Sequence, residues 1–113
     1  MNIGIDLGGS HIALGVVDNK GKILKKCDHE IKEKERENIK KFIERFIIEK
    51  YNECKNEFEI NKIGIAIPGT VNDVEIIRAI NLGVENYKLV ENFKKNIDIP
   101  IFLKNDVKML CMR

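Results

Sequence analysis

The sequence predicts a mixed α/β fold, in which a β-hairpin meander is followed by strands that are linked by helices. Near the amino terminus, short segments rich in Ile and Val are separated by turn residues, as is typical of antiparallel strands. Further along, apolar side chains recur every three or four residues over one long segment, which indicates an amphipathic helix. More short apolar segments follow it. We therefore expect a mixed sheet with helices on its faces.

Three antiparallel strands are expected first. Residues Ile3–Leu7 and Ile12–Val17 are predicted strands, joined through Gly8-Gly9-Ser10-His11. The segment Asp18-Asn19-Lys20-Gly21 predicts a tight turn, because Asn and Gly tolerate the positive φ angles that hairpins need. A third strand from Lys22 to about Ile31 completes the meander.

A long helix and a buried strand come next. The helix is predicted from Glu35 to about Lys55, and its apolar residues form one stripe at a spacing of 3.6 residues per turn. The stripe consists of Ile39, Phe42, Ile43, Phe46, Ile47, Tyr51 and Cys54. The strand Lys62–Ile67 ends at Pro68-Gly69, because Pro lacks a backbone donor and Gly permits a sharp reversal.

The last part of the chain alternates strands and helices. A turn at Val71-Asn72-Asp73 leads to a short strand at about Glu75–Ala79. A weaker helix at about Lys88–Asn96 precedes the strand Ile101–Leu103. Asn105-Asp106 is expected to cap a final helix, since both residue types are strong helix N-caps.

Length and composition limit the function classes. The chain has 113 residues, 43% hydrophobic and 34% charged, as expected for about one soluble domain. Its net charge of only +2 does not favour nucleic-acid binding. The three cysteines are far apart and form no C-x-x-C pair, which argues against a disulfide framework or a zinc site. We find no export signal and no apolar stretch long enough for a membrane span, so a cytoplasmic location is expected.

A candidate phosphate site follows the first strand. The turn through Gly8 and Gly9 offers backbone N–H groups with no Cβ in the way, and Ser10 adds a hydroxyl. Asp6 could hold Mg²⁺ through water. The alternative is a plain Gly-Gly hairpin turn. An acid inside an apolar strand weighs against that alternative, because burial of an unpaired carboxylate costs stability.

Asn105-Asp106 is the second candidate. Asp106 could accept the proton of an attacking hydroxyl, while Asn105 hydrogen-bonds neighbouring hydroxyls and orients the substrate. The helix cap described above is an equally good interpretation. Two further turns, Pro68-Gly69-Thr70 and Asn81-Leu82-Gly83, are ordinary turn formers in isolation. Both follow predicted strands, however, and open α/β sheets collect ligand groups at the carboxyl ends of strands.

The order of elements resembles the ribonuclease-H-like domain of the actin-like ATPase superfamily, which includes sugar kinases. Four segments together resemble the ROK family of sugar kinases and related repressors. They are Ile3 to Ile12 (IGIDLGGSHI), Ile63 to Val71 (IGIAIPGTV), Asn81-Leu82-Gly83, and Pro100 to Asp106 (PIFLKND). Their order and spacing match along essentially the whole chain.

The resemblance implies ATP-dependent phosphorylation of a hexose or hexosamine hydroxyl, with ATP and Mg²⁺ as cofactors. It assigns the catalytic base to Asp106, which also binds the sugar, and further sugar contacts to Asn105, Gly69 and Asn81. It assigns the phosphate side to Gly8, Gly9 and Ser10, with Asp6 for the metal. Repressors of the family carry a winged helix ahead of the first strand, whereas this chain begins on that strand. The expected partners are therefore a sugar and ATP, with no nucleic acid and no membrane.

The resemblance covers the family's amino-terminal lobe, residues 1–113, so we expect the carboxy-terminal lobe to be absent from this chain. That lobe supplies the Glu and His sugar ligands, a structural zinc and most adenosine contacts in the family. The isolated chain is accordingly expected to be nearly inactive, and its sugar and oligomeric state are left open. Two alternatives remain: a non-catalytic sugar-binding or regulatory module, and an ATPase lobe of the actin-like or heat-shock type.

Overall fold

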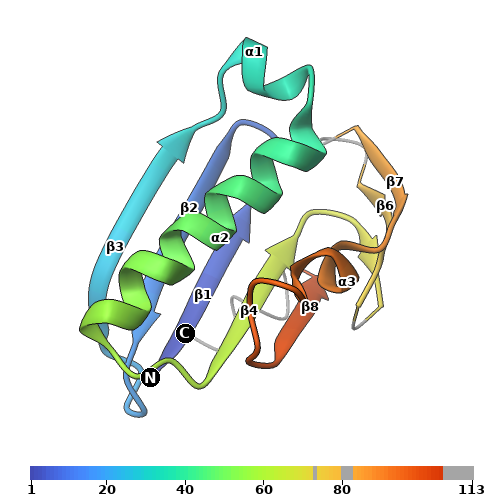
Figure 1. Cartoon of the computed structure of the whole chain (residues 1–113). Coiled ribbons are helices and arrows are strands. Elements are labelled where there is room, and N and C mark those ends of the chain that lie inside the picture. The colour runs from blue at the N-terminus through green and yellow to red at the C-terminus, as the bar shows by residue number, and fades with distance from the viewer. Residues whose placement is uncertain (73, 80–82, 106–113) are drawn as a thin grey trace.

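The computed structural model describes residues 1–72, 74–79 and 83–105. Within these residues, the main sheet has five strands in the order β3-β2-β1-β4-β8 (Figure 1). Strands β1, β2 and β3 form the antiparallel meander, and β4 and β8 run parallel to β1. Their bounds are Asn2–Leu7 (β1), His11–Val17 (β2), Ile23–Glu30 (β3), Lys62–Ile67 (β4) and Ile101–Asn105 (β8). The predicted mixed sheet, with its meander, is confirmed.

The predicted long helix is two helices. The structure has a short helix α1 (Glu33–Arg36), a break at Asn38, and then α2 (Ile39–Glu57). Asn38 has φ −137° and ψ 57°, which lies outside the helical region. The prediction of one continuous helix was wrong because the apolar stripe begins only at Ile39, so nothing packs the earlier turn against the sheet. The stripe itself is confirmed, since Ile43, Phe46, Ile47, Tyr51 and Cys54 are buried.

A second, three-stranded sheet lies beside the first within the described residues. It consists of β5 (Thr70–Val71), β6 (Ile76–Ala79) and β7 (Val84–Tyr87), paired antiparallel in the order β5-β6-β7. The sequence predicted only the middle strand. In both β6 and β7 the first and last residues are buried and the two between are exposed, so the alternation that marks a strand is missing.

The weaker helix is present but shorter than predicted. It is α3 (Leu89–Phe93), and it places Leu89, Val90 and Phe93 in the core. The final helix predicted after Asn105-Asp106 lies outside the described residues. No helix in the described ranges is long and apolar enough to cross a membrane.

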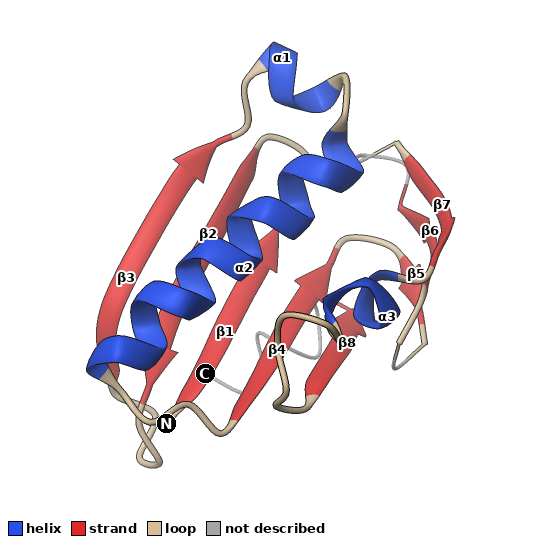
Figure 2. Ribbon diagram, viewed as in Figure 1, coloured by secondary structure: helices blue, strands red, loops and turns tan. Residues whose placement is uncertain are grey.

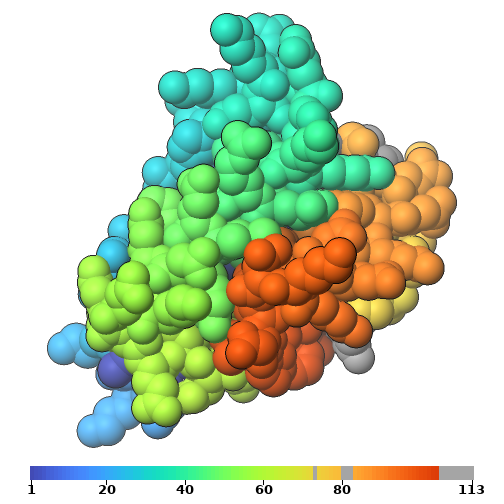
Figure 3. Space-filling model, viewed as in Figure 1, coloured from blue at the N-terminus to red at the C-terminus, as the bar shows by residue number. Residues whose placement is uncertain are grey.

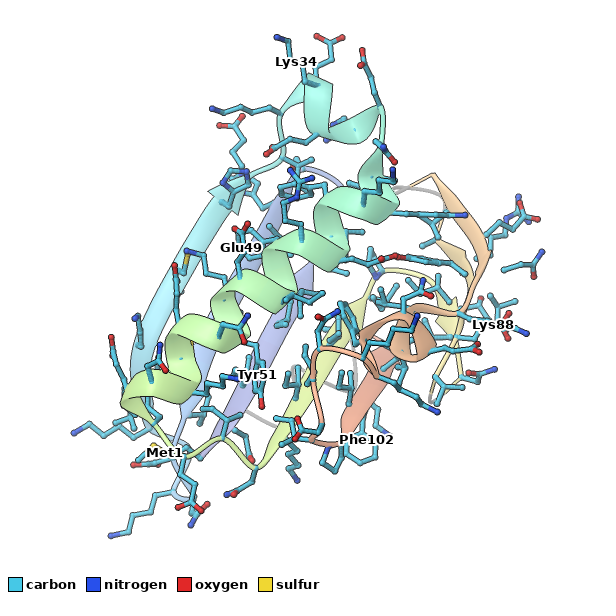
Figure 4. All side chains as sticks on the ribbon, in the orientation of Figure 1. Met1, Lys34, Glu49, Tyr51, Lys88 and Phe102 are labelled. Atoms are coloured by element: carbon cyan, nitrogen blue, oxygen red, sulfur yellow. The ribbon has the colours of Figure 1, made fainter. Side chains whose placement is uncertain are left out.

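Helices α2 and α3 cover one face of the main sheet (Figure 2). Their side chains form a continuous surface over that face (Figure 3). Figure 4 shows Tyr51 extending from α2 over the sheet. Alternate strand residues point into this layer and are almost fully buried: Ile3, Ile5, Leu7, Ile12, Leu14, Val16, Ile63, Ile65, Ile67, Ile101 and Leu103. The residues between them point to the other face, which carries small side chains at its centre.

Candidate functional site

The three parallel strands bring Asp6, the Gly8–Ser10 turn and the Asn105 main chain to one edge of the main sheet, formed by the carboxyl ends of the strands. Strand β4 pairs in register with β1 on one side and with β8 on the other. Asp6 therefore lies opposite Ala66, and Ile67 lies opposite Asn105. The arrowheads of β1 and β4 in Figure 1 mark this edge. The carboxyl ends of parallel strands are where open α/β sheets bind ligands, so the topology supports the predicted location.

Asp6 sits between two small residues. Its register partners are Ala13 on β2 and Ala66 on β4, whose methyl groups occupy little space beside the carboxylate. Because Ile5 and Leu7 point into the layer beneath α2, Asp6 points to the opposite face of the sheet. Asp6 is half-buried. Asp6 therefore lies between two alanines on the face opposite α2 and α3.

The Gly8–Ser10 turn is a tight hairpin connection. The Gly8 N–H donates to the His11 carbonyl at 2.7 Å, and a Cβ on Gly8 would lie 3.3 Å from the same oxygen. The Ser10 carbonyl accepts from the Ile31 N–H at 2.8 Å. The Gly8 N–H is therefore committed to the turn, which leaves the N–H groups of Gly9 and Ser10 as the phosphate donors of the predicted site.

His11 is directed toward β3. Its Nδ1 lies 3.2 Å from Oδ1 of Asp28, and both side chains are exposed. This pair explains the orientation of the ring without any ligand.

Gly69 has a structural reason to be glycine. A Cβ at this position would lie 2.2 Å from the Arg78 carbonyl oxygen and 2.9 Å from the Ala79 Cα, distances that no real Cβ tolerates. The Gly69 N–H donates to the Ile67 carbonyl at 3.0 Å, which turns the chain at the end of β4 toward β5. The sugar contact predicted for Gly69 stays a prediction, and the close approach of β6 is sufficient to require glycine there.

Two predicted residues, Asn81 and Asp106, lie outside the described ranges. Asn81 belongs to the connection between β6 and β7, whose nearest paired residues are Ala79 and Val84. The main chain of Asn105 ends β8. The structure therefore brings Asp6, the Gly8–Ser10 turn and the Asn105 main chain to one edge of the sheet.

The described residues contain no cluster of three or more potential metal ligands. An ion at Asp6 would rely on one carboxylate together with water and substrate oxygens. Mg²⁺ suits that arrangement, because it keeps several waters and is commonly bound by one or two carboxylates together with phosphates.

A polar network that the sequence did not reveal joins the second sheet to α2. The Tyr87 hydroxyl of β7 donates to the Glu44 carboxylate, and the Asn92 amide donates to the same oxygen at 3.1 Å. The Lys40 ammonium lies 5.1 Å from the centre of the Tyr87 ring, within the range of a cation–π contact. Burial, and then the Glu44 carboxylate, raise the pKa of Tyr87. No spacing rule connects residues so far apart in the chain, so sequence reasoning had no signal for this network.

The comparisons with known proteins agree on one family. The family described as "ROK family" matches residues 2–112. The glucokinase of Thermotoga maritima is 32% identical over 113 residues, which cover 97% of this chain and 35% of that protein. The crystal structure of a ROK hexokinase from Thermus thermophilus has a TM-score of 0.64 and 28% identity, with 93% of this chain and 35% of that chain covered.

A ROK family glucokinase from Streptomyces griseus, crystallised with glucose and AMPPNP, has the same fold. Its TM-score is 0.69 at 24% identity, with 93% of this chain and 33% of that chain covered. The chain thus spans about a third of the length of the relatives it matches.

Proposed function

The chain belongs to the ROK family, and from that premise we propose that it forms the lobe of an ATP-dependent sugar kinase that supplies the catalytic base and part of the phosphate site. The acceptor would be a hydroxyl of a hexose or hexosamine. The observation that carries the proposal is the shared sheet edge, where Asp6 and its glycine turn end β1 while Asn105 ends β8. Relatives that act on sugars, such as the Thermotoga maritima glucokinase, support it.

In the proposed reaction, the sugar hydroxyl oxygen attacks the γ-phosphorus of ATP and its proton passes to the Asp106 carboxylate. A new P–O bond forms to the sugar, and the bond from the γ-phosphorus to the bridging oxygen breaks, releasing ADP. Asn105 would hold neighbouring sugar hydroxyls so that the attacking oxygen lies in line with the leaving group.

The phosphate side would use the Gly9 and Ser10 N–H groups and the Ser10 hydroxyl as donors. Asp6 would hold Mg²⁺ through water, and the bound ion would neutralise charge on the phosphates. The small Ala13 and Ala66 side chains on either side of Asp6 are compatible with a hydrated ion at this carboxylate.

The experiment joins residues 1–113 to the carboxy-terminal part of the Thermotoga maritima glucokinase and measures ADP release with hexoses and hexosamines offered in turn. Asp106→Asn should lower kcat by about 100-fold or more, the usual range for loss of a general base. Asp98→Asn, at an exposed position before β8, is the matched control and should retain activity. Full activity in Asp106→Asn would remove Asp106 as the base.

Calorimetry on the unjoined chain separates the alternative role. A sugar that binds this chain while Mg·ATP does not would support a non-catalytic sugar-binding module. Hydrolysis of ATP by the joined protein at the same rate with and without sugar would instead point to an ATPase of the actin-like type.

A further inference from the structure

A row of paired residues runs across all five strands of the main sheet, from β3 to β8, beside the proposed phosphate site. Ala13 pairs with Asp28 and with Asp6, and Ala66 pairs with Asp6 and with Lys104. Residues in register on neighbouring strands point to the same face of a sheet. Lys104 on β8 and Asp6 on β1 are therefore on one face, on either side of Ala66 in this row.

The burial of β8 confirms which face this is. Ile101 and Leu103 are 8% and 1% exposed and point into the layer beneath the helices. Phe102, labelled in Figure 4 at the start of β8, is 42% exposed, and Lys104 is half-buried. Lys104 thus points away from α3, to the face that carries Asp6. It lies one residue before the end of β8, at the same edge as the Gly8–Ser10 turn.

The charges of this row have a spacing that suits a phosphate group. Neighbouring strands are about 4.8 Å apart, so the Asp6 and Lys104 backbones are separated by roughly 10 Å. Lys104 forms no ion pair with any residue that the structure describes. Along that distance, the Asp6 carboxylate would hold a hydrated cation, a phosphate would lie beside the cation, and the Lys104 ammonium group would lie beyond the phosphate. Unlike charges would then be next to one another.

We propose that Lys104 is a phosphate-binding residue, whose ammonium group donates to an oxygen of a magnesium-bound polyphosphate chain on the side opposite Asp6. The inference deepens the proposed function and rests on it for the identity of the natural ligand, ATP. Lys104 holds the phosphate chain but takes no proton and forms no bond. The flexible four-carbon stem of lysine would let the ammonium group reach the phosphate from β8, across the small Ala66 side chain.

The test measures binding of magnesium tripolyphosphate to the 113-residue chain by ³¹P NMR titration. Lys104→Met should weaken binding by about tenfold or more, as expected for loss of a hydrogen bond from a charged group. Lys104→Arg, which keeps the charge, should bind within about threefold of the unchanged chain. Lys26→Met is the matched control, since Lys26 pairs with Gly15 on the opposite edge strand, on the same face, and should bind normally.

Equal binding by Lys104→Met and the unchanged chain would overturn the inference, as would an unchanged chain that does not bind tripolyphosphate. Amide NMR spectra of each variant confirm that the fold is retained. In the joined protein, Lys104→Met should raise KM for ATP and leave KM for the sugar unchanged. A joined protein that phosphorylates no sugar, while Lys104→Met still loses tripolyphosphate binding, would reject the proposed kinase and keep the phosphate site.

Discussion

The Tyr87 hydroxyl donates a hydrogen bond to the Glu44 carboxylate, and this contact ties the second sheet to the long helix over the main sheet. Tyr87 is only 5% exposed, and Asn92 donates to the same carboxylate oxygen. The connection that contains Asn81 begins and ends on strands of the second sheet. The orientation of that sheet relative to the edge that carries Asp6 therefore depends in part on Glu44.

Removal of the Tyr87 hydroxyl should destabilise the protein. In Tyr87→Phe the Glu44 carboxylate loses its buried donor, which costs about 1–3 kcal/mol when the partner is charged. Urea unfolding at pH 7 measures the difference. Tyr51→Phe is the matched control, because Tyr51 is also buried but makes no hydrogen bond within the described part of the chain. A smaller loss in Tyr87→Phe than in Tyr51→Phe would contradict the prediction.

The same tyrosine should limit stability at high pH. Burial and the Glu44 carboxylate raise the pKa of Tyr87 in the folded state, whereas an unfolded tyrosine titrates at about 10. The raised pKa means that the protonated Tyr87 hydroxyl stabilises the folded state. This contribution to the free energy of unfolding is complete below about pH 10 and is lost as pH rises through the raised pKa. Unfolding measured between pH 8 and about pH 11 should show a steeper decline for the unchanged chain than for Tyr87→Phe. Parallel curves would show that Tyr87 is not responsible.

Glu35 should contribute stability that disappears in acid. The Lys32 N–H, which donates to the Glu35 carboxylate at 2.8 Å, and then the His29 ring lower the pKa of Glu35. A lowered pKa stabilises the folded state above the unfolded value of about 4.3, and the effect is lost as pH falls through the folded value. Glu35→Gln should therefore reduce stability at pH 6 more than at about pH 3. An equal loss at both pH values in urea unfolding would argue against this account.

Gly69→Ala should lower the free energy of unfolding far more than Gly4→Ala does. The added methyl group at position 69 would overlap the Arg78 carbonyl, and overpacking of this kind costs about 1–3 kcal/mol. A Cβ at Gly4, in the middle of β1, would have no atom within 4 Å. Thermal unfolding of the two variants compares them directly. If Gly69→Ala keeps the unfolding temperature of Gly4→Ala, the close approach of β6 does not restrict this position.

Replacement of Asp6 tests the proposed metal site. Asp6→Asn keeps the shape of the side chain but removes its charge, so the joined protein should need about 10–100 times more Mg²⁺ for half-maximal activity. Asp28→Asn changes a carboxylate in the same row of the sheet, next to Ala13, and serves as the control. An unchanged magnesium requirement in Asp6→Asn would exclude the metal-holding role.

Much of the main sheet could be predicted because its signals are local. The turn at Asp18 is an example: the Asp18 carboxylate accepts from the Lys20 and Lys22 N–H groups at 2.9 Å, and Gly21 has φ +86°. Asp and Gly favour such a turn through their own chemistry. The location of Asp6 near the carboxyl end of β1, beside β4, was predictable for a similar reason, since parallel strands align their carboxyl ends.

The remaining features depend on contacts between distant residues. Strand β7 follows Gly83. Its buried and exposed residues do not alternate, and Asn86, with φ 51°, departs from the extended backbone. Tyr87 and Glu44 meet only after the two sheets have formed. The break at Asn38 separates α1, which has no buried residue, from α2, whose buried stripe packs on the sheet. Tertiary packing, rather than local preference, decided each of these positions.

The parallel pairing of β1 also has a kinetic consequence. Ile3 pairs with Val16 through a short hairpin, but with Ile63 only after the whole of α2 has been placed. Closing a short loop loses little chain entropy, whereas long-range parallel pairing loses more before its contacts form. The hairpin should therefore be the early folding nucleus, on which β4 and then β8 assemble. The edge that carries Asp6 and Lys104 would be completed last, and its formation would report the final step of folding.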